Sequence, residues 1–181
     1  MALVSAPSFE DQLKIGQVGE SLIAKWLIAK GWSVMPVYEK ELDTGKGPRL
    51  FTPGGEIIAA DMLIYKSNDA IWIEAKHKDA FTWHRITKRW VTGIDLKHYL
   101  DYCKVDEVSP WPVWLLFLQR GGQAKDSPPD SPSGLFGSTL KHLRSHENHR
   151  FENFGHGGMV YWAHGTLRKL AELEDLLCHL P

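Results

Sequence analysis

The sequence is poor in the features that mark several large classes of protein. Its two cysteines, Cys103 and Cys178, are too few for a disulfide framework or a four-ligand zinc site, which suggests reduced thiols in the cytoplasm. The longest apolar run, Trp111–Leu118, is too short to cross a bilayer. Residues 1–8 lack the charged and apolar regions of a secretion signal. We therefore expect a cytoplasmic protein with no membrane segment.

A strong net charge is also missing. The chain has 21 Lys and Arg against 22 Asp and Glu, a formal net charge of -1, so no global positive field indicates a nucleic-acid partner. A protein of this kind that binds a polyanion must concentrate its cations locally. At 181 residues, with 43% hydrophobic residues, the chain is long enough for one domain with a sizeable core.

Two apolar, β-rich runs stand close together in the first half of the chain. They are Ile57–Tyr65 and Ala70–His77, separated by a turn-forming tetrad that begins at Lys66. Two strands with so short a connection predict an antiparallel hairpin. Side chains in a strand alternate between two faces, so the second run places Trp72, Glu74 and Lys76 on one face and Ile71, Ile73 and Ala75 on the other.

The expected register brings two carboxylates together. A turn centred between Ser67 and Asn68 places Asp61 opposite Glu74, and Lys76 opposite Ala59. Directly opposed residues have Cβ atoms roughly 4.5–5.5 Å apart, where like charges repel, so the pair needs a shared proton or a cation. Oxygen ligands suit Mg²⁺. The alternative is a solvated hairpin face with an incidental charge cluster.

Asp61, followed by Glu74-Ala75-Lys76, resembles the D-x(n)-E-x-K signature of the PD-(D/E)XK nuclease superfamily. Within that superfamily the order of elements is similar to the archaeal Holliday-junction resolvases: Glu20 in a helix, the strand sequence Gly31–Val34, and then the hairpin. The resemblance covers roughly residues 9 to 78. It departs from the pattern in one place, where Ala60 rather than proline precedes the aspartate.

The resemblance implies an α/β fold, with a restriction-endonuclease-like core of order α-β-β-β-α-β around a central mixed sheet. It also implies hydrolysis of DNA, branched or junction DNA included, with Mg²⁺ or Mn²⁺ as cofactor. Asp61, Glu74 and the carbonyl of Ala75 would hold the metal. Lys76 would orient or deprotonate a water, and Glu20 would complete the acidic cluster. The alternative is an inactive nucleic-acid-binding or assembly protein on the same fold. A homodimer is left open.

The first helix is expected after Ser8, with its end at Gly31. Gly16 and Gly19 fall on its apolar side. Glycines on a buried helix face cost stability, so they indicate a close approach to a sheet. Glu20 stands at the margin of that side, as a site residue or as an exposed boundary residue. A strand at residues 32–37 is expected at a sheet edge because Pro36 lacks an N–H.

Cations and aromatic residues interleave after the hairpin. The candidate nucleic-acid-binding residues are Lys78, Trp83, Arg85, Lys88 and Arg89, because such surfaces track phosphates and stack bases. A solvated amphipathic segment is the competing interpretation. A second candidate is the long loop at residues 38–56, which contains Lys40, Lys46 and Arg49. That loop is either an arm over the DNA backbone or a variable surface insertion.

The remaining elements complete the predicted core of about residues 9–119. A helix at Ile94–Val105, capped by Thr92, leads to Pro112–Gln119, whose apolar composition predicts a central parallel strand. Residues 120–137 are rich in Gly, Pro and Ser and predict a flexible loop.

A C-terminal addition is expected over residues 138–181. We predict a strand at residues 158–163 and a helix at residues 166–177, with the stretch 138–149 left ambiguous. His142 and His146 could share a metal on a helix, but no Cys or acidic partner completes a ligand set, so a polar surface is the default interpretation.

Overall fold

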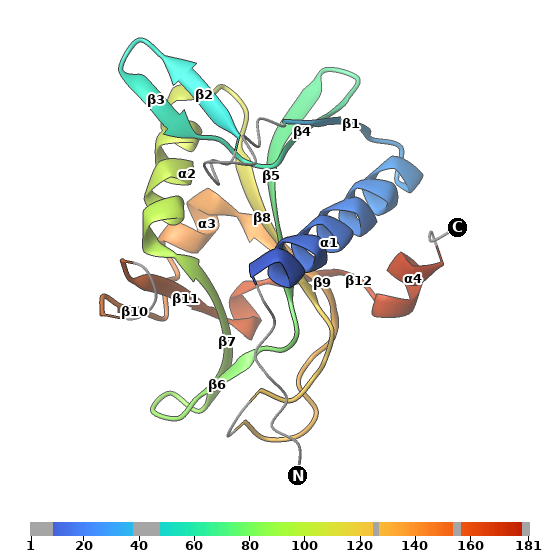
Figure 1. The fold of residues 1–181 in the computed structure, drawn as a ribbon, viewed down its shortest axis with the longest axis vertical. Helices are drawn as coiled ribbons and strands as arrows, with labels where there is room; N and C mark the ends of the chain where they lie inside the picture. The colour runs from blue at the N-terminus through green and yellow to red at the C-terminus, as the bar shows by residue number, and fades with distance from the viewer. Residues whose placement is uncertain (1–8, 38–47, 125–126, 154–156, 179–181) are drawn as a thin grey trace.

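The computed structural model describes residues 9–37, 48–124, 127–153 and 157–178, and for residues 9–16 only the backbone. A six-stranded sheet of order β1-β4-β5-β8-β9-β12 runs through the molecule (Figure 1). Its strands are β1 (Ser33–Pro36), β4 (Met62–Lys66), β5 (Asp69–Lys78), β8 (Val113–Gln119), β9 (Gly134–Thr139) and β12 (Arg168–Ala171).

The sheet is mixed because only its central pair is parallel. β5 and β8 run parallel, with Glu74 opposite Leu115, whereas β1, β4, β9 and β12 pair antiparallel to their neighbours. The parallel pair is connected by α2 (Leu96–Val108), as a crossover between parallel strands requires. β1 lies at the edge of the sheet, as Pro36 predicted.

Helices cover both faces of this sheet. α1 (Phe9–Ala29) packs Leu22, Ile23 and Trp26 against one face, together with α4 (Leu173–Leu177). α2 and the short α3 (Leu140–Arg144) cover the other face, where Tyr99 and Val105 of α2 are buried against the strands. The α/β fold with a central mixed sheet, and its core order α1-β1-β4-β5-α2-β8, confirm the prediction.

A second sheet lies on the α2 side and was not foreseen. Its order is β10-β11-β7-β6, formed by β6 (Thr82–His84), β7 (Arg89–Asp95), β10 (His149–Phe151) and β11 (Met159–Ala163). β7 leads directly into α2, so this sheet is tied to the core helix. The buried Trp162 of β11 donates a 3.0 Å hydrogen bond from Nε1 to the Leu143 carbonyl, which anchors the sheet to α3.

Two predicted loops are strands in part. Residues 49–56 of the expected loop, with the first two residues of the expected strand Ile57–Tyr65, form a separate hairpin of β2 (Arg49–Thr52) with β3 (Gly55–Ile58). In this hairpin Arg49 and Glu56 make a 2.9 Å ion pair. The loop expected to reach residue 137 ends earlier, because β9 begins at Gly134. Leu135 and Phe136 are fully buried between β8 and β12, and that burial overrides the glycine-rich composition.

Two predicted helices also needed correction. The helix expected from Ile94 begins at Leu96, and Thr92 lies in β7, where its hydroxyl accepts a 3.1 Å hydrogen bond from Gln119 instead of capping a helix. The C-terminal helix expected at residues 166–177 is the 3₁₀ turn η1 (His164–Thr166), the strand β12 and the five-residue α4. Pairing with β9 supplies the backbone hydrogen bonds of β12, so tertiary contacts decide its conformation.

Candidate active site

Asp61 lies where the pairing of the central hairpin stops. The register is the one expected, with Met62 opposite Ile73 and Leu63 opposite Trp72. The predicted first strand is nevertheless broken before Asp61: β3 pairs with β2, and the Ala59 N–H donates to the Pro48 carbonyl at 2.9 Å. The expected pairing of Lys76 with Ala59 is therefore wrong.

At this break the Asp61 carboxylate, rather than a backbone carbonyl, bonds to β5. The N–H of Ala75 donates a 2.9 Å hydrogen bond to Oδ2 of Asp61. Because the N–H and C=O of one strand residue point to the same side, the Ala75 carbonyl is also directed toward Asp61 and away from β8. The break in the strand thus brings one carboxylate and one backbone carbonyl to the same place.

Glu74 and Lys76 project from β5 on the α2 face of the sheet, as the alternation predicted. The Glu74 side chain is 1% exposed and Lys76 is 28% exposed, and the Lys76 ammonium is in ion-pair contact with Oε1 of Glu74. A carboxylate this buried is costly unless cations accompany it, and Lys76 supplies one of them.

Burial and the charge of Glu74 raise the pKa of Asp61 from 3.8 to about 7. Two carboxyl groups that face each other in a buried site cannot both ionise cheaply. A cation that binds both groups removes this repulsion. The carboxylate pair therefore has the electrostatics of a cation site that also tolerates a proton.

Burial alone would lower the pKa of Lys76, but the charges of Glu74 and Asp61 outweigh it, so this pKa is raised above its ordinary value. Glu20 makes a further, smaller contribution in the same direction. Lys76 is therefore a cation at neutral pH, and Glu20 acts on the same group as the two strand carboxylates.

α1 packs closely against β5 because the α1 residue at the contact is a glycine, Gly19. This close packing lets Glu20 act on Lys76. A Cβ atom on Gly19 would lie 2.5 Å from the Cβ of His77, a distance that side chains do not tolerate. His77 is the residue after Lys76, so the close approach predicted from the helix glycines holds α1 beside the site.

Two residues of α2 near the site, His98 and Tyr102, were missed by the sequence analysis. The buried Tyr102 hydroxyl has a strongly raised pKa, through burial and then through the charges of Glu74 and Asp61. Burial and Lys76 lower the pKa of His98, and Asp95 opposes them. His98 and Tyr102 are four residues apart on α2 and face the same side, with ring centroids 6.4 Å apart. That spacing was the available signal.

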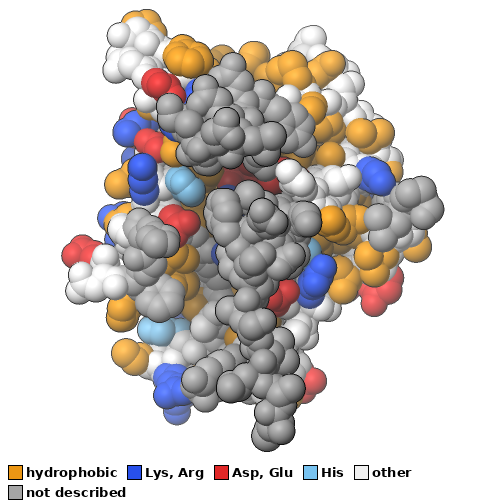
Figure 2. Space-filling model, viewed as in Figure 1, with side chains coloured by type: hydrophobic (Ala, Val, Ile, Leu, Met, Phe, Trp, Pro, Cys, Tyr) orange, Lys and Arg blue, Asp and Glu red, His pale blue; other side chains and the backbone are white. Residues whose placement is uncertain are grey.

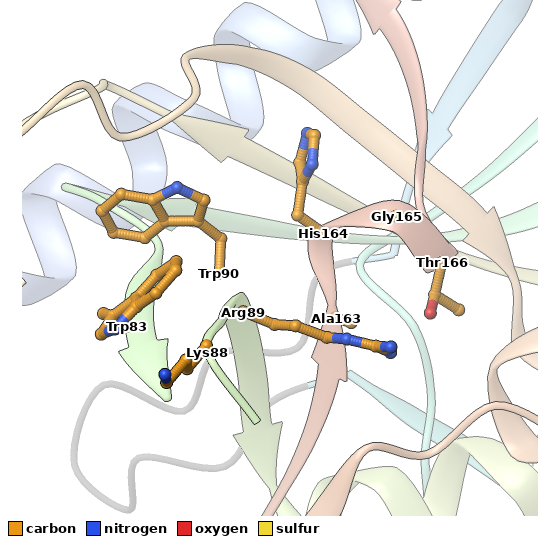
Figure 3. A pocket seen from close by; sticks show the side chains of 8 residues that line it. All are labelled: Trp83, Lys88, Arg89, Trp90, Ala163, His164, Gly165 and Thr166. Atoms are coloured by element: carbon orange, nitrogen blue, oxygen red, sulfur yellow. The ribbon is translucent and has the colours of Figure 1, made fainter. Parts of the chain in front are cut away.

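The candidate nucleic-acid-binding residues separate into two places. Lys78 lies in β5, two residues after Lys76, and burial and then Lys76 lower its pKa while Asp95 opposes them. Trp83, Lys88 and Arg89 line a cavity of about 390 Å³ on the second sheet (Figure 3). Arg85 is exposed in the turn between β6 and β7.

The structure describes only one of the three candidate cations in the expected loop at residues 38–56. Arg49 is paired with Glu56 in the β2–β3 hairpin, and Lys40 and Lys46 lie outside the described residues. On the described part of the face in Figure 2, basic and acidic side chains are interspersed, with no continuous field of one sign.

The side-chain rings of several histidines in the C-terminal part stack on neighbouring rings. His142 and His146 stack with centroids 4.1 Å apart, and His149 stacks between His84 and Tyr161. Within the described ranges, no group of three or more His, Cys, Asp or Glu side chains is arranged to hold a metal ion. The candidate cation site at Asp61 and Glu74 likewise offers two carboxylates and not three. No described helix is both long and apolar enough to cross a membrane.

No protein-family model and no curated protein match this sequence. Among solved structures, the fold is similar to Hjc, a Holliday junction resolvase from the hyperthermophile Archaeoglobus fulgidus, with 7% identity and a TM-score of 0.47, over 83% of this chain and 90% of that one. It is also similar to a nuclease from a fusselovirus, with 12% identity and a TM-score of 0.38, over 98% and 95% of the two chains. At these identities the likeness concerns the fold alone.

Proposed function

We propose that this protein is a metal-dependent nuclease that hydrolyses phosphodiester bonds of DNA. The observation that carries the proposal is the carboxylate pair of the half-buried Asp61 and the buried Glu74, with Lys76 in ion-pair contact at its edge. Replacing a buried charged group of this kind by apolar residues is often neutral or stabilising, so fold stability alone does not account for the pair. Two carboxylates with an ammonium beside them suit chemistry on a phosphate.

The donor set fits a hard divalent cation, Mg²⁺ or Mn²⁺. Two carboxylates and one backbone carbonyl are the ligands such an ion takes from protein, with water and phosphate at its other positions. Asp61, Glu74 and the Ala75 carbonyl would hold it, and Glu20 would add its charge from α1. A bound divalent cation polarises a phosphoryl oxygen and lowers the pKa of a water.

The residues around the carboxylates supply the remaining functions. Lys76, which keeps its proton, donates a hydrogen bond and offsets the negative charge that develops on the phosphate. Lys78 adds a second ammonium beside it. Tyr102 stays protonated because its pKa is raised, so its hydroxyl is a donor that holds Glu74 or a water in place.

We take DNA as the substrate, with branched DNA included, and the cytoplasm as the location, since Cys103 and Cys178 are free thiols that suit a reducing compartment. The alternative function is binding without cleavage. Incubation with linear, nicked, single-stranded and four-way-junction DNA separates the two, in Mg²⁺, Mn²⁺ or EDTA. Binding without metal-dependent cleavage of any substrate would contradict the proposed nuclease.

The site is tested by Asp61→Asn and Glu74→Gln, which keep shape and remove charge. Each should lower metal-dependent cleavage by roughly 10²-fold or more, because the cation loses a charged ligand. Asp69→Asn is the matched control, since Asp69 is an exposed carboxylate of the same hairpin. Full cleavage by both site variants would exclude this pair as the metal site.

A further inference from the structure

The cavity on the second sheet combines aromatic and cationic side chains in a way that the cleavage site does not require. Trp83 of β6 and Trp90 of β7 lie opposite each other in the ladder and pack edge to face, with centroids 5.2 Å apart. The cavity measures about 390 Å³, within the range of small-ligand pockets of ~300–1,000 Å³. In Figure 3 the two indoles lie together at one side of it.

Two cations, Lys88 and Arg89, complete the lining, which includes no carboxylate from the described residues. Among the described residues neither cation forms an ion pair. Arg89 extends across the cavity toward Thr166, away from the indoles (Figure 3). The cavity therefore has a flat apolar part and a separate anion-binding part.

The backbone at Lys88 supports a role for its side chain. Lys88 has a φ of 50°, a left-handed conformation that glycine adopts at no steric cost and that asparagine and aspartate tolerate better than lysine. Residues held in such conformations are enriched at ligand-binding sites. Beside it, Ile86 in the β6–β7 turn is 88% exposed, and an apolar side chain at such a tip can insert between base pairs.

We propose that this cavity binds one unpaired nucleotide of the DNA substrate. The base stacks on Trp83 and Trp90, and Lys88 and Arg89 bind its phosphate. Thr166 and His164 supply polar groups at the far wall, where the His164 ring is fixed edge-on by Phe81 and Phe136. Bases stack on aromatic side chains in single-strand binding proteins, and a paired base cannot reach the indoles. The inference rests on the proposed function in that DNA is the ligand, and it makes the nuclease selective for DNA with an unpaired nucleotide.

The fold sets a distance between this pocket and the carboxylates. β7 runs from Arg89 at the cavity to Asp95, whose charge reaches Lys78 and His98 of the cleavage site. Six residues of antiparallel strand extend about 20 Å. The pocket and the carboxylates therefore lie toward opposite ends of β7, so a nucleotide held in the pocket should place the cut at a fixed offset from the unpaired position.

The binding test uses 2-aminopurine, whose fluorescence is quenched on stacking. A duplex carries it either as a single-nucleotide bulge or in a base pair, and the titration is made in EDTA, so that no cleavage is needed. The wild-type protein should quench the bulged probe and bind it at least tenfold more tightly than the paired one. Trp83→Ala and Arg89→Ala should each remove that preference. Equal binding of the two probes by the wild type overturns the proposal.

Matched variants separate loss of the pocket from loss of the fold. Trp111→Ala removes an exposed indole outside the cavity, and Lys66→Ala removes an exposed cation at the end of β4, also outside the cavity; both should keep the preference. Trp83→Phe, which preserves ring packing, should keep most of the quenching if Trp83→Ala alters the circular dichroism. A preference that survives in a folded Trp83→Ala protein overturns the pocket.

A cleavage assay distinguishes failure of the pocket from failure of the proposed nuclease. In Mg²⁺ the wild type should cut the bulged duplex faster than the fully paired one, and Arg89→Ala should bring the ratio of the two rates close to one and lose the fixed offset of the cut. If the wild type does not cut any DNA yet binds the bulged probe selectively in EDTA, the nuclease is wrong and the pocket stands. Cleavage by the wild type with no effect of the bulge on rate or position overturns the pocket alone.

Discussion

Gly19 of α1 lies against His77 of β5 so closely that a methyl group on the glycine would be 2.5 Å from the histidine Cβ and 2.8 Å from its Cγ. His77 is held on its other side, because its Nε2 accepts a 2.9 Å hydrogen bond from Arg120 Nε. The ring therefore cannot simply swing away. This contact fixes the distance between the helix that carries Glu20 and the strand that carries Glu74 and Lys76.

We predict that Gly19→Ala destabilises the protein by about 1–3 kcal/mol, the usual cost of forcing extra volume into a packed contact. Metal-dependent cleavage should also fall, because α1 must move away from β5 and take Glu20 with it. Gly54→Ala is the control, since a Cβ there meets only Thr52 Oγ1 at 3.7 Å. Thermal unfolding of the two variants checks this. Equal midpoints would show that the α1–β5 contact is loose.

The register of the central hairpin could be predicted because it depends on local chemistry. A short polar turn and a period of two decide which residues are opposed, so Asp61 and Glu74 could be brought together from sequence. The break before Asp61 could not be foreseen. It arises because β3 pairs with β2, although the apolar run that contains β3 was expected to pair with β5 throughout. The composition of the run does not show which partner each part of it takes.

The second sheet could not be predicted either, because its strands pair with partners far away in the sequence. β7 pairs with β11, about seventy residues later in the chain, with Gly93 opposite Tyr161, and such long-range pairing leaves no periodic signal in either segment alone. A Cβ on Gly93 would meet the Val160 carbonyl, so the glycine, which reads as a helix breaker in sequence, permits close strand contact. Trp83 was predicted to lie among cations, but its pairing with Trp90 depends on the β6–β7 ladder, which the sequence did not reveal.

The stability of the protein should depend on pH through Asp61. Its folded-state pKa of about 7 exceeds the ordinary 3.8, so the folded state holds a proton that the unfolded state releases. Below pH 4 both states are protonated and no penalty arises. Between pH 4 and 7 the stability falls as pH rises, and above 7 the full penalty remains, at most about 4 kcal/mol.

Urea unfolding at pH 5 and pH 8 measures this effect, in EDTA and in Mg²⁺. In EDTA the wild type should be less stable at pH 8, whereas Asp61→Asn should lose most of the difference. Mg²⁺ should stabilise the wild type more at pH 8 than at pH 5, because a cation replaces the proton. A wild type whose stability in EDTA is the same at both pH values would show that Asp61 is not in the repulsive pair.

Lys76 should act through its charge and its hydrogen bonds. Lys76→Ala is expected to abolish turnover while DNA binding persists, because the ammonium beside Glu74 is lost. Lys76→Arg should not restore turnover, since a planar guanidinium places its charge and donors differently. Single-turnover cleavage and equilibrium binding measured on the same variants check both statements. An arginine variant with wild-type rates would reduce Lys76 to general charge neutralisation.

The last prediction concerns how a protein of net charge -1 holds a polyanion. Each phosphate that a cation neutralises on duplex DNA contributes about 0.9 to the slope of log K against log salt. The turn between β6 and β7 places Arg85, Lys88 and Arg89 together on an exposed surface. Replacing all three by Ala should reduce the magnitude of the slope by about two to three.

Two controls separate phosphate contacts at the β6–β7 turn from base stacking and from a general loss of charge. Trp83→Ala should weaken binding with little change in slope, because stacking releases no counterions. Replacing three exposed lysines elsewhere, Lys66, Lys104 and Lys141, should leave the slope nearly unchanged, which separates a local contact from the loss of three charges. If both triple variants reduce the slope equally, the β6–β7 turn is not where the backbone lies. An unchanged slope in the turn variant would place the DNA on another part of the surface, and with it the path by which the substrate reaches Lys76.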